Sequence, residues 1–380
     1  MQKTAATLAE LDTPCLVLDA ARMRRNIARL KARLAPFGVR LRPHLKTPKC
    51  IEVARELMET PQGPATVSTL KEAEQFAAAG VKDILYAVCI APHKLARAGR
   101  LRAAGVDLTL VVDSVPAAQA VAAHARATRD RIPALLQIAS DGHRSGVRPA
   151  DDLLVEIGRA LQDGAELRGV MTHAGASYDL HGAAALAEIA EQERRAAVSS
   201  AERLRAAGLP CPVVSVGSTP TAHFARDLSG VSEVRAGVFV FFDLVQAGIG
   251  VCTPDDVALS VLASVIGHQK EKGWIITDAG WMAMSRDRGT AKQAVDQGYG
   301  MVCDAEGRPY ADLIVADANQ EHGVLALRRG SRAALPDLPV GALVRILPNH
   351  ACATGAQHER YHVLDGGSNP VAEWRRFSGW

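Results

Sequence analysis

The stretch Arg42-Pro-His-Leu-Lys-Thr-Pro-Lys49 decides how the rest of this chain is read. It closes a short β-type run over 39–41 and precedes a helical pattern over 51–58. This order predicts that Lys46 stands at the carboxyl end of a strand. Barrels of alternating strands and helices keep their chemistry at that end of their strands.

Two interpretations of Lys46 are open. The first is a solvated loop lysine, which is the ordinary state of this residue. The second is an amine that forms a Schiff base with a carbonyl cofactor. The nearby cations Arg42, His44 and Lys49 favour the second interpretation, because crowding by positive charge helps a lysine to lose its proton.

An order of strand, loop and helix repeats through residues 39–241. The predicted strands are 39–46, 65–70, 83–88, 107–113, 134–139, 167–173, 212–216 and 233–241. Helical patterns lie between them at 71–79, 94–104, 115–127, 152–162, 183–207 and 222–228. Eight alternating units favour a (β/α)8 TIM-type barrel over a doubly wound sheet. No G-x-G-x-x-G follows a predicted strand, which weighs against a dinucleotide fold.

The pattern changes near Gly250. From Val257 onward the apolar runs are short and β-like, and Gly and Asp bound them. We therefore expect an α/β barrel domain over 20–250 and a second, all-β domain over 251–380.

Composition narrows the function further. The 380 residues include 44 basic and 41 acidic side chains, spread without a basic stripe, so we expect a small-molecule partner and no nucleic acid. Seven cysteines without paired spacing fit reduced thiols in the cytoplasm. With neither an apolar leader nor a long apolar run, the sequence predicts no membrane association.

The loops after the last predicted barrel strands carry polar motifs. Val216-Gly-Ser-Thr-Pro-Thr221 and Arg235-Ala-Gly-Val238 fall where such barrels bind phosphate, with a helix expected to start near Thr221. Ordinary turn chemistry explains either motif alone. Together they predict a phosphate site formed by Gly217, Ser218, Thr219, Gly237 and Val238.

A third motif, Leu347-Pro-Asn-His-Ala-Cys352, lies in the predicted β domain. Residues i and i+2 of a strand share a face, so a strand here would bring His350 and Cys352 together. Imidazole and thiolate are good ligands for Zn²⁺. The alternative is a buried cysteine beside a surface histidine.

These motifs resemble fold-type III pyridoxal-phosphate enzymes, alanine racemase-like in their barrel. The likeness covers nearly the whole chain and points to the branch that holds D-threonine aldolase, D-serine dehydratase and D-threo-3-hydroxyaspartate dehydratase. It implies that residues 1–19 join the β domain through a strand over 13–19. It also implies that Lys46 carries pyridoxal 5'-phosphate and removes the substrate's Cα proton.

The resemblance assigns further cofactor contacts. Arg144, in Asp141-Gly-His-Arg-Ser-Gly-Val147, would lie near the phenolic oxygen of the cofactor, although an arginine in such a loop often serves only as a cap. His173 would stack on the pyridine ring with Tyr178 close by, the alternative being a structural histidine. Arg235 matches the arginine that contacts the pyridine nitrogen in alanine racemases.

One departure from the family pattern lies on the fifth predicted strand. Related sequences usually carry acidic residues near Gln137 and Ala139, and this chain does not. How this side of the cofactor site is tuned is therefore left open.

In the β domain, the dehydratases of this branch carry a His-x-Cys metal pair where many aldolases carry His-x-Asp. His350 and Cys352 would thus hold a divalent metal, Zn²⁺ first and Mn²⁺ or Mg²⁺ as alternatives. Gln320, Glu321 and His322 would border an active site near the interface of a homodimer.

The implied activity is a pyridoxal-phosphate- and metal-dependent dehydratase. It would act on a D-β-hydroxy-α-amino acid such as D-threo-3-hydroxyaspartate or D-serine and give an oxo acid and ammonia. Lys46, His350 and Cys352 would carry the chemistry. The alternatives are a D-threonine aldolase, which yields glycine and an aldehyde, and a non-catalytic pyridoxal-phosphate-binding barrel.

Overall fold

The computed structural model describes residues 7–380 and divides into two compact units. One unit contains the chain up to Ala28 together with Val238–Arg376, and the other contains Arg29–Gly237 and Phe377–Trp380. The division falls inside helix α1, Ala20–Leu34. The second of these units is the barrel unit below, and the first is the β unit.

Parallel strands form the barrel unit, as the repeating pattern predicts. Among the described residues there are eight, in the order β2-β9-β8-β7-β6-β5-β4-β3. A bridge between His44 and Thr66 joins β2 to β3 and nearly closes the sheet into a barrel. The strands are β2 Arg40–Pro43, β3 Ala65–Val67, β4 Asp83–Cys89, β5 Asp107–Val112, β6 Pro133–Ile138, β7 Glu166–Thr172, β8 Val213–Val216 and β9 Glu233–Ala236.

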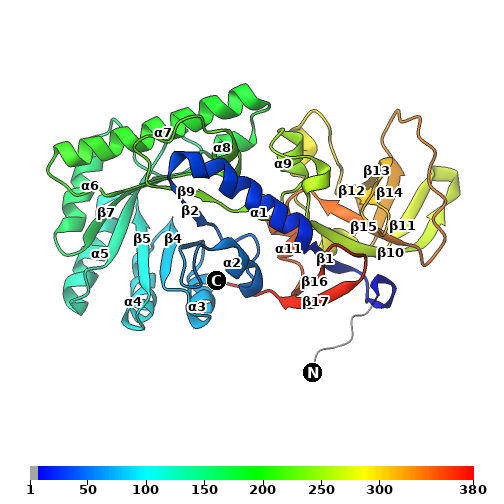
Figure 1. Cartoon of the computed structure of the whole chain (residues 1–380), viewed down its shortest axis with the longest axis horizontal. Coiled ribbons are helices and arrows are strands. Elements are labelled where there is room, and N and C mark those ends of the chain that lie inside the picture. The colour runs from blue at the N-terminus through cyan, green and yellow to red at the C-terminus, as the bar shows by residue number, and fades with distance from the viewer. Residues whose placement is uncertain (1–6) are drawn as a thin grey trace. The chain divides into compact units, whose positions relative to one another are not determined.

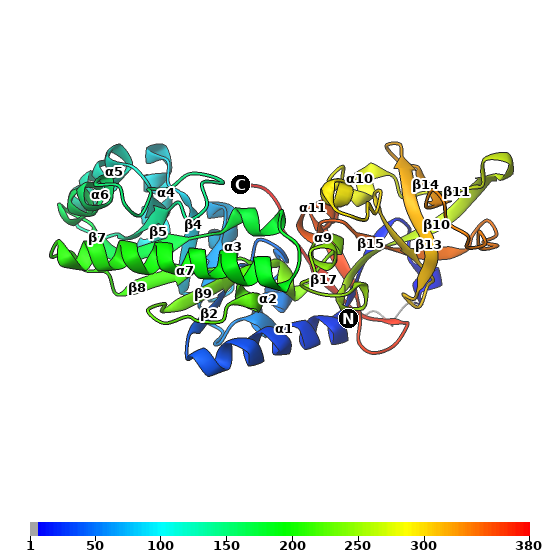
Figure 2. The same ribbon diagram turned by 90° about the horizontal axis from the view of Figure 1, so that it is seen from above.

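Helices follow the strands and cover the barrel sheet (Figure 1). They are α2 Ile51–Leu57, α3 Leu70–Ala78, α4 Leu95–Ala103, α5 Val115–Thr128, α6 Leu153–Gln162, α7 Ala183–Ala206 and α8 Thr219–Phe224. Figure 2 shows the long helix α7 running beside β7 and β8. Its alanine-rich buried face lets the helix approach these strands closely.

Several predicted element ends are wrong. Strand β2 ends at Pro43, so Lys46 lies in the turn after the strand and not in it. Strand β9 ends at Ala236 and a 3-10 helix, Val238–Val240, follows. Both strands are only four residues long, and the apolar run that suggested a longer β9 is buried without being paired.

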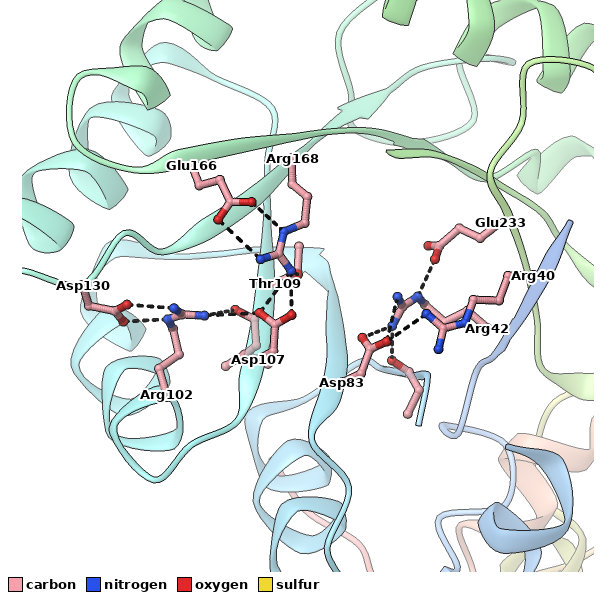
Figure 3. Close-up of polar contacts among 12 residues, drawn as sticks. Arg40, Arg42, Asp83, Arg102, Asp107, Thr109, Asp130, Glu166, Arg168 and Glu233 are labelled. Carbon is pink, nitrogen blue, oxygen red and sulfur yellow. Dashed lines mark hydrogen bonds and ion pairs between the residues drawn. The ribbon is translucent and has the colours of Figure 1, made fainter. Parts of the chain in front are cut away.

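Ion pairs line the amino ends of the barrel strands (Figure 3). Arg42 Nε is 2.7 Å from Glu233 Oε2, and Arg42 Nη1 is 2.6 Å from Asp83 Oδ1. Arg168 Nη1 is 2.9 Å from Asp107 Oδ2 on the other side. Lys46 follows the carboxyl end of β2. The charged layer therefore lies at the end of the barrel opposite the candidate chemistry.

The β unit is built around one sheet. Counting only residues 7–380, the sheet has nine strands in the order β11-β14-β13-β12-β15-β10-β1-β16-β17. The strands are β1 Cys15–Asp19, β10 Leu259–Gln269, β11 Trp274–Thr277, β12 Gly300–Cys303, β13 Pro309–Ala318, β14 Gly323–Leu327, β15 Leu343–Pro348, β16 Arg360–Leu364 and β17 Pro370–Arg375. Short helices α9 Leu244–Gly248, α10 Trp281–Met284 and α11 Ala351–Gly355 accompany them.

The first strand pairs inside this sheet, as the resemblance implies. Strand β1 is antiparallel to β10 and parallel to β16. Its residues Leu16, Val17 and Leu18 are almost fully buried. None of the helices within residues 7–380 combines the length and the apolar character that crossing a membrane requires.

Candidate cofactor site and metal centre

Lys46 lies in the turn after β2, and its Nζ has no hydrogen bond or ion pair with any described residue. Two of the cations expected to crowd it are neutralised elsewhere. Arg42 pairs with Asp83 and Glu233, and Lys49 Nζ is 3.3 Å from Glu72 Oε1. The amine is therefore available for covalent chemistry.

His44 lies beside Lys46 as a neutral imidazole. The amide of Lys46 donates to His44 Nδ1 over 3.4 Å, so the ring proton is assigned to Nε2, which faces Ser68 Oγ at 3.4 Å. Burial, followed by the nearby charges of Lys46 and Arg235, holds the pKa of His44 well below its usual value.

His173 follows β7 and is also neutral. Its Nδ1 is 2.9 Å from the carbonyl oxygen of Gly217, which can only accept, so Nδ1 carries the proton. Burial, then the charges of Lys46 and Arg144, lower the pKa of His173 to about 3. The ring centroid of Tyr178 lies 6.1 Å from that of His173.

Arg144 lies in the exposed loop after β6. Asp141 attaches this loop to the segment after β7, because its Oδ2 accepts the amide of Ala176 over 2.8 Å. Arg144 is close enough to His173 to lower the pKa of the imidazole. Gln137 on β6 is buried, and its amide donates to the carbonyl oxygen of Ile138 over 3.5 Å.

The predicted phosphate turn begins a helix two residues earlier than expected. Ser218 caps α8, whose first residue is Thr219, by accepting the Thr221 amide over 3.2 Å. Gly217 has φ +131°, and a Cβ there would lie 2.2 Å from the carbonyl oxygen of Arg235, so only glycine fits.

The second phosphate motif follows β9. A Cβ on Gly237 would come within 3.1 Å of His44 and Thr47 atoms, so this glycine lets the turn pack closely against the Lys46 segment. Val238 opens the 3-10 helix Val238–Val240.

The side chain of Arg235 is buried inside the barrel unit and does not face solvent. Its guanidinium donates to the hydroxyl of Ser215 and the carbonyl oxygen of Thr172. Burial lowers the pKa of Arg235 to about 10. Glu233 accepts a 2.6 Å hydrogen bond from Ser215, so this hydroxyl links Arg235 to the ion pairs at the amino end.

The candidate metal ligands converge for a different reason from the one predicted. Strand β15 ends at Pro348, and His350 is the N-cap of α11 with Cys352 in its first turn. The two side chains come within hydrogen-bond distance of each other. The idea of a shared strand face is thus wrong, although the pairing holds.

Sequence reasoning missed two acidic residues at this centre. Asp287 Oδ2 is 2.6 Å from His350 Nδ1. Asp243 is buried and accepts the Ala351 and Gln246 amides, each over 3.0 Å. Burial disfavours the protonated imidazole, but the hydrogen bonds to Asp287 and Cys352 outweigh it and raise the pKa of His350 to about 11.

The donor set at this centre suits a metal with few protein ligands. Within the described chain, no group of three or more His, Cys, Asp or Glu side chains is arranged to hold a metal ion. His350 and Cys352 offer one nitrogen and one sulfur, so any ion here would keep positions for water or substrate.

The remaining candidates lie in the turn between β13 and β14. Gln320, Glu321 and His322 are exposed there. The carbonyl oxygens of Asn319 and Gln320 accept the amides of Trp281 and Met282 at 2.9 and 3.1 Å. These two hydrogen bonds therefore hold the first turn of α10 against the turn between β13 and β14.

The barrel residues also fit pyridoxal phosphate. Such a cofactor requires a lysine amine, here without a partner among residues 7–380, a neutral imidazole beside an aromatic ring, and a glycine-containing turn such as the one at the start of α8. A barrel with this lysine, followed by a separate β unit, defines the class as pyridoxal-phosphate enzymes.

Comparison with known proteins agrees with this class. Residues 18–245 match the model of the alanine racemase N-terminal domain, and residues 258–364 match that of a serine dehydratase domain. The chain belongs to the fold-type III pyridoxal-phosphate family, in the branch that joins these two domains.

Named relatives cover the chain almost end to end. It is 58% identical to D-threo-3-hydroxyaspartate dehydratase of Delftia sp. strain HT23, over 98% of this chain and 99% of that protein. It is 28% identical to the D-serine dehydratase of Dictyostelium discoideum over the full length of both. It is also 28% identical to an Arthrobacter D-threonine aldolase, over 95% of this chain and 91% of the relative.

Solved structures give the same result. The Delftia dehydratase structure matches with a TM-score of 0.95 and covers 98% of this chain and 100% of its own. A D-threo-3-hydroxyaspartate dehydratase variant in its metal-free form, with one cysteine replaced by alanine, matches with a TM-score of 0.96, 57% identity and coverage of 99% of this chain and 100% of its own.

Proposed function

We propose that this protein is a dehydratase that converts a D-β-hydroxy-α-amino acid, D-threo-3-hydroxyaspartate first among them, to an oxo acid and ammonia. The observation that carries the proposal is 58% identity over almost the whole chain with an enzyme of that name. The more distant aldolase and D-serine dehydratase relatives make glycine formation and D-serine turnover outcomes to be measured.

Lys46 would hold pyridoxal phosphate covalently and then act as the base at the substrate's Cα. Its amine suits both roles because no described side chain competes for it. When bound, the cofactor withdraws electrons from Cα and makes its proton acidic. A single lysine can hold the cofactor and later move the proton, since substrate displaces it from the first role.

The other barrel residues would orient the cofactor. Neutral His173, with Tyr178 beside it, would pack on the ring, and Arg144 would approach the phenolic oxygen. Gly217, Ser218, Thr219, Gly237 and Val238 would receive the phosphate. Arg235 already donates to Ser215 and Thr172, so any bond to the pyridine nitrogen uses a remaining N–H of its guanidinium.

The metal would be held by His350 and Cys352. A divalent ion there supplies a Lewis acid, which makes a β-hydroxyl a better leaving group. Thiolate ligation favours Zn²⁺ over Mn²⁺ or Mg²⁺. The cysteine variant of the relative, described as metal-free, supports a role for Cys352 in metal binding.

Overall, the amino acid loses water and the resulting enamine takes it back on hydrolysis. The net change is one amino acid to one oxo acid and one ammonia. The decisive experiment incubates the metal- and cofactor-loaded enzyme with D-threo-3-hydroxyaspartate, D-serine and D-threonine and measures ammonia and glycine. We expect ammonia without glycine, whereas glycine as the main product would overturn the proposal in favour of an aldolase.

Assembly and location complete the proposal. The proposed assembly is a homodimer, whose interface would cover exposed apolar residues such as Met282 and Val295, which are 43% and 54% exposed in the β unit. A cytoplasmic location is supported by seven cysteines, none of which is joined to another in a disulfide. Sedimentation of the holoenzyme would test the dimer.

A further inference from the structure

Helix α7 buries one charged residue among apolar ones. Its buried face consists of Leu186, Ala187, Ile189, Ala190, Glu193, Ala196, Ala197, Ser200, Ala201 and Leu204. Glu193 is only 2% exposed. A carboxylate placed there loses much of its hydration, so a compensating set of contacts is required.

The compensating donors include two backbone amides from neighbouring loops. Glu193 Oε1 accepts the amide of Ala174 over 2.8 Å and that of Gly217 over 3.1 Å. Ala174 follows β7 and Gly217 follows β8, so one oxygen atom joins the two loops. Both loops belong to the proposed cofactor site.

A third hydrogen bond closes a ring through these loops. His173 Nδ1 donates to the carbonyl oxygen of Gly217 over 2.9 Å, and His173 is bonded to Ala174 through the chain. The ring thus runs from the imidazole to Gly217, across to Glu193, and back through Ala174. Because the imidazole proton and the Gly217 peptide plane are both fixed in it, moving one moves the other.

We infer that Glu193 is a positioning residue, which sets the orientation and tautomer of His173 and the placement of the phosphate turn at Gly217. The inference rests on the proposed function only for the identity of the cofactor. The geometric requirement is an acceptor oxygen at one point in space. A negative charge is not needed for either amide bond.

This requirement makes glutamine the conservative replacement. Glu193→Gln keeps the acceptor, and its new amide group can face the hydroxyl of Thr221, which already contacts the carboxylate. Glu193→Leu removes the acceptor and leaves two buried amides without partners. Glu193→Asp retracts the acceptor by one methylene. Glu191→Leu, on the same helix, removes ion pairs with Arg194 and Arg195 and serves as the control.

Two measurements test the inference. The first is the dissociation constant of pyridoxal phosphate for the apo-protein, from absorbance titration. The second is the ¹⁵N spectrum of the His173 ring in the apo-protein, assigned by its loss in His173→Gln, which reports the tautomer without any cofactor.

We expect Glu193→Gln and Glu191→Leu to stay within threefold of wild type in affinity and to keep the Nδ1–H tautomer. Glu193→Leu should weaken cofactor binding at least tenfold and alter the ring signals. If Glu193→Leu does not fold, Glu193→Asp should show the same two changes. A folded Leu or Asp variant with wild-type affinity and ring signals would overturn the inference, as would a glutamine variant as impaired as leucine. Wild-type protein that binds no cofactor would instead refute the proposed function, while the ¹⁵N signals of the His173 ring would still test the positioning role of Glu193.

Discussion

The imidazole of His350 and the carboxylate of Asp287 meet at 2.6 Å, between Nδ1 and Oδ2, although 63 residues separate them in the sequence. Since Nδ1 is engaged, Nε2 is the nitrogen left for a metal. A carboxylate behind a ligating histidine fixes the ring and makes it a better donor.

Asp287→Asn should therefore weaken metal binding by about 10- to 100-fold. Isothermal titration of the metal-stripped protein with Zn²⁺ measures this directly. Asp296→Asn, which removes an exposed partner of Arg288, is the matched control and should leave the affinity unchanged. Equal affinities for the Asp287 variant and wild type would show that the carboxylate has no part in metal binding.

Lys46→Ala should abolish covalent cofactor attachment, while Lys49→Ala should retain it, because Lys49 is already paired with Glu72. Borohydride reduction of the wild-type holoenzyme, followed by peptide mapping, should label Lys46 alone. We expect at least a thousandfold loss of activity in the first variant, since it removes both the attachment point and the base. Label on any other lysine would contradict the assignment of the cofactor site.

Cys352→Ala should keep the cofactor absorbance but lose ammonia release by at least a hundredfold, because one of the two proposed protein ligands of the metal is gone. EDTA should reproduce this loss and added Zn²⁺ should restore the wild type. Cys303→Ala, at a buried cysteine of the same unit, is the control. Cys352→Asp replaces sulfur by oxygen and should shift the metal preference toward Mn²⁺ or Mg²⁺. Full ammonia production by the alanine variant in EDTA would rule out a metal-assisted step.

The stability of the apo-protein should depend on pH through His173. Its pKa of about 3 in the folded chain lies below the unfolded value of about 6.5. The unfolded chain therefore binds an extra proton between these values, so this contribution to stability is present above pH 6.5 and is lost as the pH falls toward 3. In His173→Gln the free energy of unfolding should fall less steeply with acid, by about 1.4 kcal/mol per pH unit. Urea titrations between pH 4.5 and 6.5 measure both slopes, and identical slopes would refute a neutral, buried His173.

Arg42→Met should destabilise the barrel unit by about 3–5 kcal/mol, because it leaves Glu233 buried without its cation. Arg308→Met is the exposed counterpart, with a side chain 76% exposed, and should cost far less because solvent screens its ion pairs. Urea unfolding followed by circular dichroism compares the two. Adding Glu233→Gln to the first variant should recover part of the loss, and no recovery would show that the unpaired charge is not its cause.

Periodicity was enough to predict the barrel. Strands such as β5 and β6 are continuous apolar runs between helices with a clear buried face, so type and order follow from local pattern. Strand ends did not follow from it. The proline at the end of β2 and the buried run after β9 both look like extended chain in the sequence. A strand, however, ends where its hydrogen bonds to a neighbouring strand end.

The candidate site likewise contains residues that the sequence could predict and residues that it could not. Lys46, His173 and Gly217 stand next to strand ends and could be predicted from motifs. Asp287 could not, because it lies in an irregular segment and meets His350 only through the fold. Glu193 carried a readable signal: it is the charged residue on the apolar face of α7.

Strand β1 is synthesised long before the two strands with which it pairs. The ribosome delivers Cys15–Asp19 at the start, but one partner, Leu259–Gln269, comes about two thirds of the way along the chain and the other, Arg360–Leu364, near its end. At about 5–20 residues per second, the last partner follows roughly 20–70 seconds later. Until Leu259–Gln269 is made, this apolar segment has neither edge occupied, so the nascent chain depends on chaperones to shield it from other chains.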